Sequence, residues 1–369
     1  MDASRIRRRI AAFRERAGIS QVDLARALGV KDRQIISNIE TGERKVSADE
    51  LVRLADIFDV ELSAFSDPYR VVDEASFSWR RNEVPEQTIQ EFENQAVNWL
   101  ALYRHLSRTA GEPVNSLVPK LDITEKSSFE DAASEGESIA AQFDLGAVPA
   151  LSLEQALDEK LNVLVLQIDA PDGISGAACR LGGLNFVLVN RSESPARRAF
   201  NLAHELFHLA TWDQMPPAHI ENVRLRANGN PRPEQLANAF ASGLLMPRKP
   251  MEALINQHPK PEAAEHIAWI MTLANAMGVS GPAMKWRLVD LGYLPRAQAK
   301  RIDDEKLRLN HGANSHAPLP FSPRFVERLR WGLEHGRLTV RRAAGLMGMT
   351  IDALHALFTE HDVPAPFDL

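Results

Sequence analysis

Three residues in the run 199–210 have the types and the spacing of a zinc hydrolase: His204, Glu205 and His208. The surrounding residues have the pattern of a helix. Side chains four positions apart share one helical face, so both imidazoles can bind one metal ion. Glu205 lies beside His204, where its carboxylate can take a proton from a metal-bound water. The alternative is an ordinary helix that carries two core or surface histidines.

A third ligand would separate these two interpretations, because catalytic zinc usually binds three side chains and one water. Residues 231–247 offer one, since prolines suit a helix start, apolar residues recur at helical spacing, and Met246-Pro247 would end the helix. Glu234 in the first turn is the predicted third ligand. Asn238, one turn further on, is predicted to support the ligands rather than to bind metal. The alternative role of Glu234 is to complement the helix dipole.

Residues from about 138 to 290 resemble the ImmA/IrrE metallopeptidase family. The likeness runs through Arg197 to His208, continues through Glu234 to Ala241, and ends at residues 244–247. Two separated motifs in the right order are more specific than the histidine motif alone. The resemblance implies Zn²⁺ bound by His204, His208 and Glu234, with Glu205 as general base. It also implies proteolysis of helix-turn-helix repressors in bacteria.

The charge of the chain is divided unevenly along its length. The whole sequence has a net charge of −6, but residues 1–46 contain eleven basic against six acidic residues. The net charge of that stretch is therefore +5, which leaves −11 for the remainder. This asymmetry predicts a small head that binds a polyanion, joined to an acidic body.

Residues 5–66 resemble the Cro/C1-type (XRE) helix-turn-helix family. The likeness rests on Ser20-Gln21-x-x-Leu24-Ala25-x-x-Leu28-Gly29-Val30 and on Ile36 to Arg44, within helices expected at 4–17, 21–28, 32–41 and after Ser47. It implies double-stranded operator DNA as a partner. The predicted DNA-binding residues are Gln21, Lys31, Arg33, Gln34, Ser37, Asn38 and Arg44.

One departure from that family pattern affects the predicted recognition helix. The chain has one residue more than usual between Val30 and Glu40, so the turn is expected to be longer. Which of Asp32, Arg33, Gln34 and Ser37 reads bases is therefore open, although Arg and Gln suit guanine and adenine edges. The alternative is a small helical module for dimerisation or docking that does not contact DNA.

The composition of the chain limits the classes of protein to which it can belong. The 369 residues suffice for two or three domains, and 44% hydrophobic with 25% charged residues is typical of soluble globular protein. No apolar run has transmembrane length, and the basic N-terminus lacks the apolar core of a signal peptide. The single Cys179 cannot form an internal disulfide and is interpreted as a packed residue on a strand, rather than a ligand or nucleophile. The expected compartment is a bacterial cytoplasm, with no membrane partner.

The other segments are expected to be as follows. Residues 67–135 form a connector whose helix at 86–106 links head to body or builds a dimer interface. Strands at 162–168, 176–180 and 184–190, with a Gly182-Gly183 hairpin, precede the metal helices. Asp213 and His219, between those helices, could enter the site. Residues 300–320, with His311 and His316, form a solvent-facing connector. Residues 321–360 form a degenerate helix-turn-helix used for packing or dimerisation, with DNA binding as the alternative.

The sequence therefore predicts a mainly α, multidomain protein. Its expected domains are a helix-turn-helix at 1–66, a connector at 67–135, a zincin-like α+β peptidase with a small sheet at 136–298, and C-terminal helices at 299–369. The predicted function is a DNA-binding transcriptional regulator with a zinc metalloendopeptidase that cleaves a helix-turn-helix repressor, or a loop in a partner copy, in a stress or mobile-element response.

Two alternatives remain beside this function. One is a non-proteolytic transcription factor whose peptidase-like domain senses a ligand or binds a partner. The other is an antitoxin in which the acidic body of the chain binds a toxin. The intact Glu205 favours catalysis, because a structural site has no need of a general base. Two-fold operators usually require two heads, which suggests a homodimer.

Overall fold

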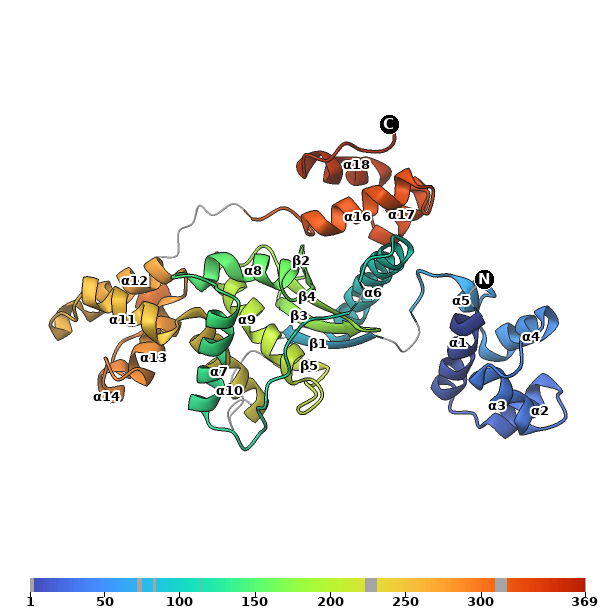
Figure 1. The fold of residues 1–369 in the computed structure, drawn as a ribbon, viewed down its shortest axis with the longest axis horizontal. Coiled ribbons are helices and arrows are strands. Elements are labelled where there is room, and N and C mark those ends of the chain that lie inside the picture. The colour runs from blue at the N-terminus through green and yellow to red at the C-terminus, as the bar shows by residue number, and fades with distance from the viewer. Residues whose placement is uncertain are drawn as a thin grey trace.

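The computed structural model describes residues 3–71, 75–81, 84–113, 115–222, 231–308 and 317–368, and for 220–222 it describes the backbone. The molecule is mainly helical, with an N-terminal helical head, a central sheet covered by helices, and a C-terminal group of three helices (Figure 1). Among the described residues, no single helix is long and apolar enough to cross a membrane, although one bent pair of helices, Ala263–Met277 with Gly281–Asp290, meets that test jointly.

The head consists of five helices whose ends follow from local chemistry. They are α1 (Ala3–Arg16), α2 (Gln21–Leu28), α3 (Arg33–Thr41), α4 (Ala48–Phe58) and α5 (Ser63–Ser66). Ser20 and Ser47 cap α2 and α4, because each hydroxyl accepts a hydrogen bond from a first-turn backbone N–H. Gly29 and Gly42 end α2 and α3 with φ values of 73° and 89°, which favour glycine.

A five-stranded mixed sheet occupies the centre of the protein. Its strands are β1 (Ala75–Arg81), β2 (Val163–Ile168), β3 (Ile174–Leu181), β4 (Leu184–Asn190) and β5 (Ile220–Asn222), in the spatial order β2-β4-β3-β1-β5. Strands β1, β3 and β4 are antiparallel neighbours, whereas β2 with β4 and β1 with β5 are parallel. The predicted hairpin turn at Gly182-Gly183 is present, with φ values of 55° and 93°.

Both faces of this sheet are buried, so successive side chains of a strand enter two different cores. On β2, for example, Val163 and Val165 pack into one core, and Leu164 and Leu166 into the other. The first core contains α7 (Phe129–Gln142), α8 (Pro149–Glu159), α9 (Pro195–Thr211) and α10 (Arg232–Leu245). The second contains α6 (Glu86–Thr109), α16 (Pro323–Glu334), α17 (Val340–Met347) and α18 (Ile351–Glu360).

The segment expected to be a connector, residues 67–135, differs most from the sequence prediction. The long helix is present as α6, but its apolar side packs on the sheet instead of facing a linker or a partner chain. Residues 75–81 form β1, a central strand between β3 and β5. Helix α7 begins at Phe129 and packs against α10. The prediction failed because the partners of β1 lie far along the chain, so no local pattern reveals the pairing.

The remaining helices complete the body. They are α11 (Arg248–Gln257), a 3₁₀ turn at Ala263–Glu265, α12 (His266–Met277), α13 (Gly281–Asp290), α14 (Arg296–Ala299) and α15 (Asp304–Arg308). Ser280 caps α13, because its hydroxyl accepts a hydrogen bond from the Ala283 backbone N–H. The expected connector histidines His311 and His316 lie outside the described residues.

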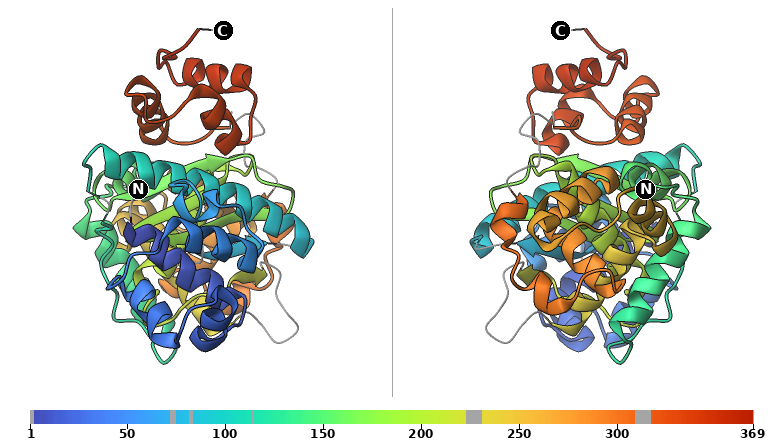
Figure 2. Two further views of the ribbon diagram at one scale, coloured as in Figure 1. Left: turned by 90° about the vertical axis from the view of Figure 1, so that its right-hand side faces the viewer. Right: turned by 90° about the vertical axis from the view of Figure 1, so that its left-hand side faces the viewer.

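The C-terminal helices stand on the α6 side of the sheet in both views of Figure 2. Trp99 on α6 donates a hydrogen bond from Nε1 to the carbonyl of Met347 at 3.2 Å, and Gln95 donates from Nε2 to that of Leu346 at 2.9 Å. Gly332 lies against Leu106, where an added Cβ would approach within 2.7 Å of the leucine Cδ2 atom. The predicted helix-turn-helix-like segment is therefore packed against the body.

Candidate functional site

Helix α9 carries the two histidines and the glutamate of the motif. The helix begins after Ser194 with Pro195 in its first turn, where the missing N–H costs nothing. His204, Glu205 and His208 have no solvent exposure. The Nε2 atoms of the two histidines point toward each other and lie 3.0 Å apart. The sequence therefore places two metal-binding nitrogens at one point inside the protein.

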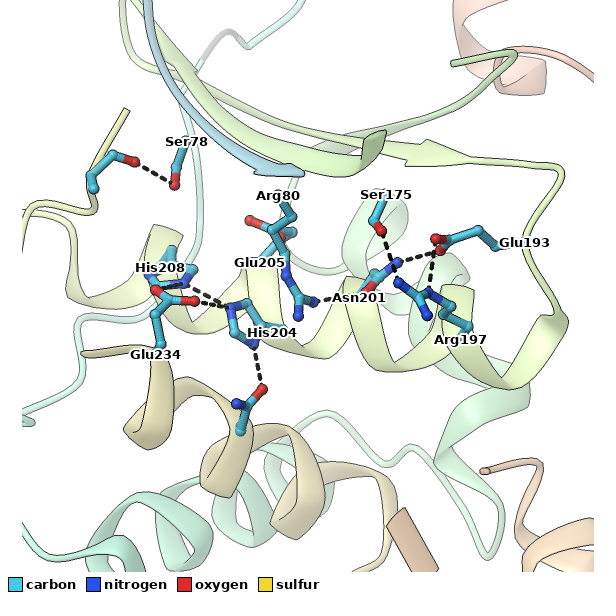
Figure 3. Close-up of polar contacts among 12 residues, drawn as sticks. Ser78, Arg80, Ser175, Glu193, Arg197, Asn201, His204, Glu205, His208 and Glu234 are labelled. Carbon is cyan, nitrogen blue, oxygen red and sulfur yellow. Dashed lines mark hydrogen bonds and ion pairs between the residues drawn. The ribbon is translucent and has the colours of Figure 1, made fainter. Parts of the chain in front are cut away.

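Helix α10 brings a carboxylate to that point. The Glu234 Oε2 atom lies 3.3 Å from His204 Nε2, and its Oε1 atom lies 3.4 Å from His208 Nε2. Figure 3 shows the three side chains converging from the two helices. They form the one group of potential metal ligands found in the described ranges.

The donor set can be tested against the geometry that zinc requires. Zinc bonds of about 2.0–2.1 Å at tetrahedral angles place neighbouring ligand atoms about 3.3 Å apart. The observed separations are 3.0, 3.3 and 3.4 Å. Two imidazoles and one carboxylate are also the ligand types of a catalytic zinc site that keeps a fourth position for water. The residues present therefore fit a zinc ion.

Asn238 lies one turn along α10 from Glu234, and its Oδ1 atom is 3.1 Å from His204 Nδ1. An amide oxygen can only accept, so this contact requires the proton on Nδ1 and leaves the Nε2 lone pair for a metal. Close packing holds α10 in place: a Cβ added at Gly136 of α7 would lie 2.3 Å from the Phe240 carbonyl oxygen. Glycine at this point lets the two helices approach closely.

Glu205 has a charged neighbour that comes from another part of the chain. The Arg80 Nε atom on β1 lies 4.0 Å from Glu205 Oε1, and Arg80 itself is only 8% exposed. Arg80 Nη1 donates to Asn201 Oδ1 at 2.7 Å, and Asn201 Nδ2 donates to Glu193 Oε2 at 2.6 Å. Sequence reasoning missed Arg80 because it belongs to a strand that was interpreted as connector. The alternation of Phe77 and Trp79 with polar residues was the available signal.

A cavity of about 670 Å³ borders this centre. Arg80 and Asn238 are among its lining residues, so the cavity borders the side chains that contact Glu205 and His204. Phe200 on α9 and Trp286 on α13 supply apolar walls. The volume lies in the range of about 300–1,000 Å³ that is typical of ligand pockets.

The recognition helix of the head presents its predicted residues unequally. Lys31, Arg33 and Gln34 are exposed, whereas Ser37 and Asn38 are half-buried. Asp32 caps α3, because its carboxylate accepts from the Gln34 backbone N–H at 2.6 Å. The Asp32 carboxylate is therefore engaged in a hydrogen bond within the protein.

Four of the predicted DNA-binding residues already have protein partners. The side chains of Gln34 and Asn38 hydrogen-bond to each other at 2.8 Å. Gln21 is half-buried and donates from Nε2 to Glu40 Oε2 at 2.7 Å. Arg44 is exposed and forms an ion pair with Glu50 at 2.8 Å. Within the described part of the predicted DNA face, Lys31 and Arg33 are therefore the exposed cations whose side chains have no partner in the protein.

Comparison with family models matches two separate parts of the chain. Residues 10–65 match the helix-turn-helix family, and residues 158–288 match a peptidase family described as the IrrE N-terminal-like domain. The protein is a fusion of an XRE-type helix-turn-helix domain with an IrrE-like peptidase domain. Both predicted resemblances are thereby confirmed. By family assignment, the chain joins a domain of a DNA-binding type to a domain of a metallopeptidase type.

Other comparisons add little. No curated protein matches the fusion. A crystal structure of ComR from S. thermophilus in complex with DNA and its signalling peptide ComS is 9% identical, with 97% of this chain and 100% of that chain covered. Its TM-score is 0.18, a value at which the likeness carries no argument.

Three further residues that the sequence raised as candidates lie apart from the ligand cluster of the IrrE-like domain. Asp213 forms ion pairs with Lys120 at 2.8 Å and with Arg180 at 2.7 Å. Hydrogen bonds from Lys120 and Arg180 lower the pKa of the Asp213 carboxyl to about 2. His219 pairs with Glu93 at 2.7 Å.

Cys179 is fully buried in β3, on the face of the sheet that packs against α6. Burial raises the pKa of its thiol well above the usual value, which disfavours the reactive thiolate. The interpretation of Cys179 as a packed residue agrees with this position.

Proposed function

We propose that the fusion is a DNA-binding transcriptional regulator whose IrrE-like domain is a zinc-dependent endopeptidase. The observation that carries this proposal is the cluster of His204, His208 and Glu234 at tetrahedral spacing, with Glu205 beside it. The family assignment supports a peptidase, and the ligand set supports zinc.

Zinc, when bound by these three side chains, supplies a Lewis acid that polarises the scissile carbonyl and acidifies water. Glu205 is the residue that moves protons. Its carboxylate accepts a proton from the attacking water and later delivers that proton to the departing amine nitrogen. Arg80 places a positive charge 4.0 Å from the Glu205 carboxylate, beside the group that moves the protons. Asn238 holds His204 in the tautomer that binds metal.

We further propose that the substrate is a helix-turn-helix repressor, or a loop of a second copy, in a bacterial stress or mobile-element response. The head supports this choice, because a domain that binds operator DNA holds the peptidase close to proteins bound at the same site. Such tethering raises the effective concentration of the substrate without new contacts. The proposed setting is the cytoplasm, where operator DNA and repressors occur together.

The test uses the zinc-loaded fusion and a library of peptides derived from a bacterial proteome. We expect new peptide N-termini with the wild-type protein and a loss of about 10²–10⁴-fold in cleavage rate for Glu205→Gln, as for removal of a general base. Zinc content should be the same in both proteins, since Glu205 is not a ligand. Equal cleavage by both proteins would exclude Glu205 as the base, and no cleavage by either would exclude the peptidase.

A further inference from the structure

A small cavity lies between the head and the body, and it shares no lining residue with the metal centre. Helix α1 of the head and helix α6 of the body form its walls. Its lining residues are Arg5, Arg8, Arg9, Pro68, Arg104, His105 and Arg108. Arginines therefore dominate the cavity, and no acid is among these described lining residues. Arginine is the side chain best suited to bind phosphate and other oxyanions.

The arginines of this cavity differ from an ordinary solvated surface patch. Arg9 is 2% exposed and Arg104 is 7% exposed, whereas Arg8 and Arg108 are exposed. The cavity thus leads from solvent to two buried guanidinium groups. Several positive charges gathered in one partly dehydrated place repel one another, and a bound anion lowers that electrostatic energy.

The imidazole of His105 senses the charges around the cavity. Burial lowers the pKa of His105, and the charged groups that act on the ring are Arg5, Arg104 and Arg108, which lower the pKa further, and Asp67, which raises it. The carboxylate of Asp67 also forms an ion pair with Arg342 on α17. Three cations and one anion therefore act on this ring, so the surroundings favour a negatively charged ligand.

The size of the cavity limits the ligand. Its volume is about 30 Å³, which is well below the range of about 300–1,000 Å³ that is typical of pockets for whole organic ligands. A single phosphate group suits such a space better than a nucleotide base. Guanidinium groups also match phosphate oxygens in a bidentate manner, and a doubly charged phosphate neutralises more of the positive charge than a carboxylate does.

These arginines lie on the side of α1 that faces away from the recognition helix. Positions 5, 8 and 9 share one helical face, and position 7 lies on another. Arg7 there donates a hydrogen bond to the carbonyl of Thr41, at the end of α3. Figure 1 shows α2 and α3 at the lower end of the head, away from α6. The cavity therefore favours the phosphate of a small molecule over the backbone of DNA bound at α3.

The same place joins the head to the rest of the chain. Arg9 donates hydrogen bonds to the carbonyls of Ala64 at 2.9 Å and of Asp67 at 2.7 Å, where the head ends. A phosphate held between Arg8 of α1 and Arg108 of α6 would connect the head to the body. Occupation of the cavity therefore restricts how the head is oriented.

We infer that this cavity binds the phosphate group of a small molecule and thereby fixes the head against the body, so that the ligand changes the affinity of the head for its operator. The site goes beyond the proposed function, because it uses none of the metal-centre residues and is independent of peptidase activity. The ligand acts on the orientation of the head, whereas α3 contacts the DNA.

The first arm of the test measures binding by calorimetry, with the full chain and pyrophosphate as the probe. Wild-type protein should bind pyrophosphate, and Arg8→Gln combined with Arg108→Gln should weaken binding at least about tenfold, because two charged hydrogen-bond donors are lost. Both arginines are exposed, so the fold should be kept. Arg248→Gln combined with Arg301→Gln removes the same charge from exposed positions outside the cavity and should bind as wild type does.

The second arm locates the bound anion by nuclear magnetic resonance of the His105 ring, whose signal is identified by its loss in His105→Gln. Pyrophosphate should raise the pKa of His105 in the wild-type protein, because a nearby negative charge favours the imidazolium form. The pKa should not change in the Arg8→Gln and Arg108→Gln double variant. Binding without a change in the His105 pKa would place the anion elsewhere and overturn the site.

The third arm uses an operator duplex selected from a randomised pool, at constant ionic strength, because salt alone weakens DNA binding. Pyrophosphate should change the operator affinity of the wild type by about fivefold or more, and the operator should change pyrophosphate affinity by the same factor. The double variant should show no such coupling.

The outcomes that contradict the inference are distinct. No binding of pyrophosphate by the wild type, or equal binding by the wild type and the double variant, would overturn the site. An operator affinity that pyrophosphate leaves unchanged would overturn its effect on the head. Complete loss of pyrophosphate binding in the saturated operator complex would assign the arginines to the DNA backbone and overturn the small-molecule ligand. None of these results depends on cleavage of a peptide.

Discussion

The Arg80 guanidinium and the Glu205 carboxylate lie 4.0 Å apart, Nε to Oε1, although one belongs to β1 and the other to α9. Strand β1 pairs with β3 so that Arg80 stands opposite Gly176, and its side chain points to the α9 side of the sheet. Asn201, one turn before Glu205 on α9, fixes the guanidinium by a 2.7 Å hydrogen bond. The base of the proposed reaction is thus positioned by the strand that precedes the whole peptidase-family match.

A prediction for Arg80 follows from this geometry. Arg80→Lys keeps the charge but loses the planar group that reaches Glu205 and Asn201 together, so kcat should fall by about 10–100-fold. Zinc content should stay unchanged, because Arg80 is not a ligand. Arg81→Lys is the matched control, since the neighbouring Arg81 donates to the Val84 carbonyl at 2.7 Å instead. Equal kcat values for Arg80→Lys and Arg81→Lys would show that Arg80 does not position Glu205.

Metal content gives a direct check of the ligand set. Elemental analysis of wild-type protein purified without chelator should give about one zinc per chain, as a three-ligand site with one open position requires. Glu234→Ala should lose the metal, and Asn238→Ala should weaken its affinity by about 10–100-fold through loss of the His204 contact. The exposed carboxylate variant Glu262→Ala serves as control. Full zinc occupancy of Glu234→Ala would show that this carboxylate is not a ligand.

DNA binding should depend on the exposed cation at the start of α3. Operator duplexes can be selected from a randomised pool with the wild-type protein. Arg33→Ala should then weaken binding by about 1–3 kcal/mol if Arg33 reads a base edge, and should relax the selected sequence at one position. Arg26→Ala on α2, which carries the same charge change, should lower affinity less and leave sequence preference intact. Unchanged affinity and preference for Arg33→Ala would mean that another face of the head contacts DNA.

The lowered pKa of Asp213 predicts a defined dependence of stability on pH. Its pKa is about 2 in the folded protein, below the value of about 3.9 in an unfolded chain. The ion pairs with Lys120 and Arg180 therefore stabilise the fold fully above about pH 4, and this contribution disappears as the pH falls toward 2. The difference in unfolding free energy between wild type and Asp213→Asn should follow that course in denaturant titrations.

Salt should reduce the same difference at pH 7, because the Asp213 side chain is 48% exposed and its ion pairs are screened. A difference between wild type and Asp213→Asn that stays constant from pH 7 down to pH 2 would show that the carboxylate charge is not involved. Glu262→Gln, an exposed acid outside these pairs, provides the control for a general effect of net charge.

The sequence determined by itself those features that depend on neighbouring residues. The caps at Ser20, Ser47 and Ser280 and the turn at Gly182-Gly183 follow from local hydrogen bonding and φ preferences. The approach of His204 and His208 follows from the helical period alone. Even Glu234 was predictable, because a recognisable second helix carries it in its first turn.

Only the tertiary structure decided which distant residues share the site. Strand β1 pairs with β3, and no pattern within residues 75–81 specifies a partner about a hundred positions away. Arg80 reaches Glu205 through that pairing, and the cavity wall at Ala283 and Trp286 exists only because α13 packs beside α9 and α10. The spacing of residues along a helix determines which side chains can share one ligand. Packing between distant segments determines which other residues lie next to them, because apolar surface is buried only when the whole core assembles.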